Sequence, residues 1–165
     1  MKKILVLVVL LVTLAGISTV AYAAPDVSFD KLEPFQENET RTYTFKKNVL
    51  DSLIMESINH CSDNNEINEL WDLHEHLNKL SEDEVDLFIN CFFNTIPQEY
   101  HLLKDIDNDG KITNRDLLDY ALYLKSINPD TSSEEIYCLS NMQDNVTTYS
   151  NEVINFYLEG LLQTF

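Results

Sequence analysis

The chain has 165 residues and carries 28 acidic side chains against 11 basic ones, which gives a formal net charge of −17 at pH 7. This balance argues against binding to nucleic acid or to an anionic membrane surface, because both repel an acidic protein. It suits a protein that binds cations.

Residues 1–23 have the three-part pattern of a secretory signal peptide. Lys2 and Lys3 form a basic start, residues 4–14 form an apolar core, and Ala21 and Ala23 mark a small-residue cleavage site. An uncleaved membrane anchor is the alternative, but small and polar residues interrupt the apolar run. Cleavage leaves one domain of about 142 residues with a net charge of −19, secreted or periplasmic and free of the membrane.

The three cysteines, Cys61, Cys91 and Cys138, are an odd number for a protein in an oxidising compartment. One disulfide with one free thiol allows three pairings, and the sequence does not choose among them. Three small apolar side chains without any disulfide are an equally good interpretation.

Residues 24–45 contain two prolines and no helical period, so we expect an extended or disordered lead-in. Residues 46–95 then show helical periodicity. A polar run at 61–65 separates two apolar helical patterns, and a hairpin of two helices is the preferred interpretation.

A third helix is predicted after Ser81, because Ser81 and Glu84 have the spacing of a capping box. Pro97 is expected to open a short fourth helix over 97–104. The pair His74 and His76 does not predict a metal site, because residues two apart do not share a helix face.

Residues 105–116 carry the strongest chemical signal of the chain. Oxygen ligands at alternate positions of a twelve-residue loop are what a hard cation such as Ca²⁺ requires. Gly110, at position 6, is expected to adopt a positive φ, and Ile112, at position 8, is expected to be buried. The candidate ligands are the side chains of Asp105, Asp107 and Asp109, the backbone carbonyl of Lys111, Thr113 through a water, and Asp116 at position 12.

A weaker copy of this pattern follows 36 residues later. Thr131 and Glu134 predict a capped helix that leads into a second loop, 141–152, and apolar positions on both sides match those around the first loop. The second loop has few carboxylates and no glycine at position 6, so we expect it to bind no ion. Its Thr148 is expected to pair with Ile112 in a short two-stranded bridge.

Residues 97–163 therefore resemble a paired EF-hand lobe of the calmodulin-like superfamily. The resemblance implies an all-α fold, an EF-hand pair over 96–165 and one competent calcium loop. Residues 46–95 would then be either the helical hairpin or a degenerate EF-hand region. Asp116 stands where the family usually has a bidentate glutamate, which implies a weaker or reshaped site.

The expected function is that of an exported calcium-binding protein whose ion is mainly structural or stabilises an interaction surface on the helices. The alternative is a calcium-dependent interaction module, because the segment from Asp105 to Lys125 is similar to one dockerin repeat. An enzyme is not expected, since the sequence contains no nucleophile–base pattern, phosphate loop or zinc spacing.

Overall fold

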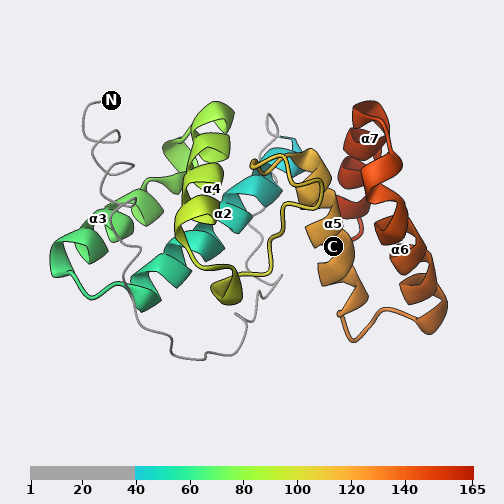
Figure 1. The fold of residues 1–165 in the computed structure, drawn as a ribbon, viewed down its shortest axis with the longest axis horizontal. Coiled ribbons are helices and arrows are strands. Elements are labelled where there is room, and N and C mark those ends of the chain that lie inside the picture. The colour runs from blue at the N-terminus through green and yellow to red at the C-terminus, as the bar shows by residue number, and fades with distance from the viewer. Residues whose placement is uncertain (1–39) are drawn as a thin grey trace. The chain divides into compact units, whose positions relative to one another are not determined.

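The computed structural model describes residues 40–165, all of whose regular elements are helical (Figure 1). The predicted all-α fold is confirmed for this part of the chain, whereas the predicted signal peptide and residues 24–39 of the lead-in lie outside it. No helix among the described residues is long and apolar enough to cross a membrane. The elements are α2 (Arg41–His60), α3 (Asn64–Glu75), η2 (Leu77–Lys79), α4 (Glu82–Thr95), η3 (Gln98–Tyr100), α5 (Asn114–Ser126), α6 (Ser133–Asn145), η4 (Val146–Thr148) and α7 (Asn151–Leu162).

The described residues form two compact units. The first unit comprises residues 46–102 and has its own apolar core, to which α2, α3 and α4 contribute. The apolar positions of the predicted helical pattern supply most of this core, as periodicity requires of amphipathic helices. Its buried side chains include Val49, Leu50, Leu53, Ile54, Leu70, Leu73, Val85, Phe88, Ile89 and Phe92.

Helix α4 starts as predicted. The Ser81 side chain accepts a hydrogen bond from the Glu84 amide, and the Glu84 carboxylate accepts one from the Ser81 amide at 2.9 Å. This reciprocal pair satisfies two backbone donors that the first turn of a helix otherwise leaves open. Lys46 of α2 ties α2 to the start of α4, because its ammonium lies 3.0 Å from Glu82 and 2.9 Å from Asp86.

The second unit comprises residues 40–45 and 103–165. Helix α5 is its centre: α6 and α7 both pack against it (Figure 1). The sequence of α5 explains this position, because apolar residues occur on more than one face of the helix. Its buried apolar side chains are Leu117, Leu118, Tyr120, Ala121, Leu122 and Leu124, and those of α6, η4 and α7 are Leu139, Val146, Ile154, Leu158 and Leu162.

The lead-in prediction is wrong at its C-terminal end, because α2 already begins at Arg41. Two tertiary contacts fix this first turn as part of the second unit. The ring of Phe45 is buried beside Tyr120, with 6.2 Å between ring centroids, and the Thr42 amide donates to the Glu159 carboxylate at 3.0 Å. Local sequence contains no signal for contacts with residues so far along the chain.

The predicted helix over 97–104 is also wrong. Only the 3₁₀ turn η3 forms there, Pro97 precedes it with ψ of 138°, and His101 is extended. So short a segment cannot offset the cost of helix nucleation by itself. Packing instead stabilises the observed non-helical conformation of this segment, because Tyr100 is buried and stacks on the His60 ring with 3.9 Å between ring centroids.

The predicted second loop, 141–152, is replaced by helical structure. Its first five residues are the end of α6, and Val146–Thr148 form η4, in which Val146 is fully buried. Thr148 therefore forms no bridge with Ile112, and no strand occurs in residues 40–165. With few carboxylates to gather around an ion and no glycine to turn the chain, this segment forms the end of α6 and a 3₁₀ turn instead.

The start of α6 is shifted by one residue from the predicted cap. Ser132, not Thr131, is the N-cap and accepts from the Glu135 amide at 3.2 Å. Thr131 instead donates its hydroxyl to the Lys125 carbonyl at 2.8 Å, which closes the turn after α5. Thr131 and Ser132 can both cap a helix, because each has a side-chain hydroxyl. Ser132 takes this role because the Thr131 hydroxyl binds the end of α5.

Candidate metal centre

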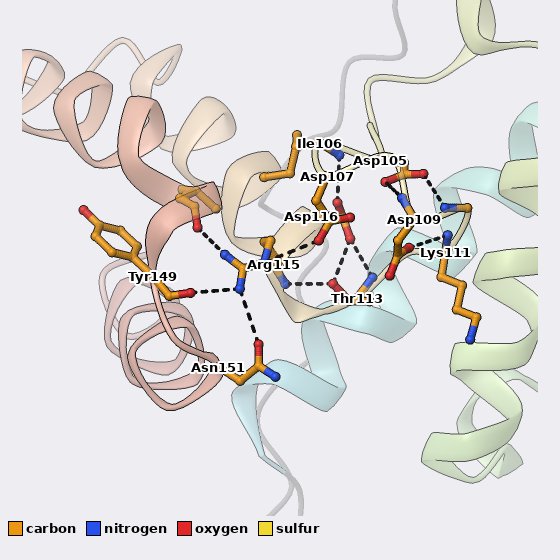
Figure 2. Close-up of polar contacts among 12 residues, drawn as sticks. Asp105, Ile106, Asp107, Asp109, Lys111, Thr113, Arg115, Asp116, Tyr149 and Asn151 are labelled. Atoms are coloured by element: carbon orange, nitrogen blue, oxygen red, sulfur yellow. Dashed lines mark hydrogen bonds and ion pairs between the residues drawn. The ribbon is translucent and has the colours of Figure 1, made fainter.

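The acidic loop 105–116 lies in the second unit and leads directly into α5. Asp105, Asp107 and Asp109 each offer a carboxylate oxygen, and these three oxygens lie within 4.8 Å of one another. Alternate residues of the loop thus point their side chains to one place, as the spacing predicted (Figure 2).

The backbone of the loop turns where the sequence indicated. Gly110 has a φ of +83°, which confirms the predicted positive φ, and Asn108 is also left-handed with a φ of 57°. The carboxylate of Asp105 accepts from the Gly110 amide at 2.8 Å and from the Asp109 amide at 3.2 Å. Asp109 in turn accepts from the Lys111 amide at 2.8 Å. These bonds hold the carboxylates in place from within the loop.

Ile112 is 7% exposed, which confirms its predicted burial. It directly precedes Thr113, the residue that caps α5. The loop is therefore attached to the second unit by an apolar anchor at its C-terminal end.

Asp116 is the most buried of the candidate ligands, with 0% exposure. Its Oδ1 accepts from the Ile106 amide at 2.9 Å, and its Oδ2 accepts from the amide and hydroxyl of Thr113 at 2.8 and 2.9 Å (Figure 2). Thr113 and Asp116 form the capping box of α5. The structure thus brings three of the six candidate residues together as a carboxylate cluster and places Asp116 as the support that closes the loop.

Arg115 is a residue of this site that the sequence analysis missed. Its Nε lies 3.5 Å from Asp107 Oδ2, and its guanidinium donates to the carbonyls of Val146 and Tyr149 (Figure 2). The signal was a single basic residue at position 11 of an acidic loop, but nothing local shows to which carboxylate it turns.

The negative charge of the site affects the pKa of Asp107. Burial raises the pKa of Asp107, and the negative charges of Asp116 and Asp109 raise it further. Each of these effects disfavours a charged carboxylate. A bound cation would remove the repulsive part of this cost.

The donor set fits Ca²⁺, because it consists of oxygen atoms converging from one short loop around a glycine turn. Residues that would hold the ion are the three clustered aspartates, with further oxygens from Lys111, Thr113 and Asp116. No thiol or imidazole takes part, so the set does not match the preferences of zinc.

Other candidate ligands are engaged elsewhere. His74 Nδ1 lies 2.6 Å from Asp51 Oδ1, and His76 Nδ1 lies 2.7 Å from the Asp72 carbonyl. All three cysteines are free, Cys138 being exposed and the other two half-buried, so neither a disulfide nor three buried thiols describes them. Within residues 40–165, the three aspartates are the one group of three or more such side chains close enough to share a metal ion.

Comparisons with known proteins found no matching protein family, no matching curated protein and no matching solved structure. The assignment of the loop therefore depends on its own residues and geometry.

Proposed function

We propose that this chain is an exported calcium-binding protein with one functional EF-hand-like loop, whose ion mainly stabilises the second unit. The observation that carries the proposal is the convergence of three carboxylate oxygens, from Asp105, Asp107 and Asp109, within 4.8 Å. The signal-peptide pattern of residues 1–23 supports export, and an acidic chain concentrates cations near its surface.

A stabilising role follows from the surroundings of the loop. Its C-terminal end is the capped start of α5, and α5 is the helix on which α6 and α7 pack. An ion that fixes the loop would therefore also fix the start of the central helix. With extracellular calcium about tenfold above the dissociation constant, binding would add about 1.4 kcal/mol to the free energy of unfolding.

The experiment is thermal unfolding with and without millimolar calcium, together with calorimetric titration. We expect calcium to raise the melting temperature by several degrees. Asp105→Asn should abolish the rise, because it removes the first carboxylate while preserving the size of the side chain. Asp144→Asn, which removes one exposed charge outside the loop, should retain it. No binding at millimolar calcium would reject the proposal.

A dockerin-like interaction module is the second candidate. The similarity to a dockerin repeat covers only the loop and the helix after it. Helix α5 follows the loop here, whereas only the 3₁₀ turn η3 precedes it, where a longer helix was expected. Under this proposal a protein partner binds the helical surface next to the loop. Capture of a cohesin-like protein, lost when a chelator is added, would favour it over a purely stabilising ion.

A further inference from the structure

Arg115 connects the acidic loop with the turn between α6 and α7. Its side chain is 15% exposed, so its charge is largely removed from water. A guanidinium in this position needs several acceptors to be stable. The acceptors are the Val146 carbonyl, the Tyr149 carbonyl at 2.8 Å, Asn151 Oδ1 at 3.4 Å and, as an ion pair, Asp107 Oδ2 at 3.5 Å from Nε (Figure 2).

The turn, rather than the loop, fixes where this guanidinium lies. Val146 begins η4, and Tyr149 follows it, just before α7. Val146 directly follows the last residue of α6, and its carbonyl also accepts from the Tyr149 amide at 3.3 Å. Carbonyls at the end of a helix carry partial negative charge, so they attract a cation. The planar fork of arginine serves two carbonyls at once, which a lysine ammonium does less well.

The same guanidinium places a fixed positive charge beside one of the three converging carboxylates. Asp107 is the acceptor of Arg115 that carries a full charge, while Val146, Tyr149 and Asn151 offer neutral oxygens. A divalent cation bound at the cluster would compete with Arg115 for Asp107 and would be repelled by its charge.

We propose that Arg115 is a positioning residue that lowers the calcium affinity of the loop by holding Asp107 from an anchor on the α6–α7 turn. This inference depends on the proposed calcium function of the loop. By thermodynamic linkage, filling the loop weakens the contact between Arg115 and Asp107, and removing that contact strengthens calcium binding by the same factor.

The test is calorimetric titration of calcium chloride into the full mature chain and its variants. Arg115→Gln removes the charge but retains a hydrogen-bonding amide, and we expect calcium to bind about tenfold more tightly. Arg115→Lys retains the charge but loses the fork that anchors it, so its affinity should lie between those of the natural chain and Arg115→Gln. Lys104→Gln is the matched control: it removes one exposed positive charge just before the loop and should change the affinity by less than about twofold.

A second measurement tests the anchor on the α6–α7 turn, and only its combination with the calcium titration separates this role from simple packing. Hydrogen exchange of amides 146–153 in the presence of chelator should be faster in both Arg115→Gln and Arg115→Lys, because both lose the fork that holds two carbonyls. A purely structural role predicts the same faster exchange with unchanged or weaker calcium binding in Arg115→Gln.

The outcomes are distinguishable. Calcium binding by the natural chain with no gain in Arg115→Gln would overturn the inference and leave the proposed function intact. Binding by Arg115→Gln alone would support the inference and overturn the proposed function for the natural chain. No binding by either protein would overturn both.

Discussion

Tyr120 shows at the scale of one residue how burial changes chemistry in this protein. It lies in α5, the central helix of the second unit, and its side chain is 7% exposed beside the ring of Phe45. Burial raises the pKa of Tyr120 to about 12, with a smaller contribution from the neighbouring Tyr123. The neutral phenol is therefore favoured by the folded state.

This pKa predicts a loss of stability at high pH. A folded pKa of about 12 lies above the ordinary value of 10.0, so the contribution is complete below pH 10 and disappears as pH rises toward 12. The difference corresponds to about 2–3 kcal/mol in the free energy of unfolding. Urea unfolding from pH 8 to 12 should show this loss in the natural chain and in the exposed-site control Tyr137→Phe. A Tyr120→Phe variant that loses just as much would contradict the prediction.

Arg115 shows which contacts of a single residue the sequence does not reveal. The sequence places Arg115 at position 11 of an acidic loop, next to Asp116. That it is held by the Val146 and Tyr149 carbonyls became visible only in the structure, because these residues lie more than 30 positions further along the chain.

At the scale of elements, the loop and α5 behave as one piece. Thr113 and Asp116 cap the helix, and Asp116 also binds the amide of Ile106 near the start of the loop. One buried carboxylate therefore closes the loop and begins the helix, which gives Asp116 a structural task independent of any ion.

We therefore predict that Asp116→Ala destabilises the calcium-free protein by about 2–4 kcal/mol, because it leaves the partly buried amides of Ile106 and Thr113 without an acceptor and removes a helix cap. Asp109→Ala is the comparison. Asp109 is exposed and accepts one amide, so its loss should cost less than about 1 kcal/mol. Urea unfolding in chelator measures both values, and equal costs for the two variants would reject this account of Asp116.

At the scale of the whole molecule, the division into two compact units should restrict the stabilising effect of calcium to the second unit. All candidate ligands belong to the second unit, whereas α3 and α4 belong to the first. Ligands stabilise most strongly the part of a protein whose opening would release them.

Hydrogen exchange is expected to show this restriction. Millimolar calcium should slow the exchange of amides in residues 105–126 and leave those in residues 64–95 unchanged. The Asp105→Asn chain should show no calcium effect in either range. Equal protection of both ranges in the natural chain would mean that the units unfold together.

The sequence by itself determined the helices of the first unit, the capping box of α4 and the local geometry of the acidic loop. These features depend on residues within a few positions of one another: an apolar period, a Ser81–Glu84 pair, and alternating aspartates around Gly110. Local spacing also gathers the carboxylates of Asp105, Asp107 and Asp109, because one loop supplies them all.

Only the tertiary structure decided where α2 begins, that residues 97–104 form little helix, that the second loop is absent, and how Arg115 is used. Each of these depends on distant partners: Phe45 on Tyr120, Tyr100 on His60, and Arg115 on Val146. Helical propensity is weak over a few residues, so burial against another element determines the outcome in such segments. The repeat after residue 131 predicted helices correctly but a second loop wrongly, because matching apolar positions indicate helices and do not determine the conformation between them.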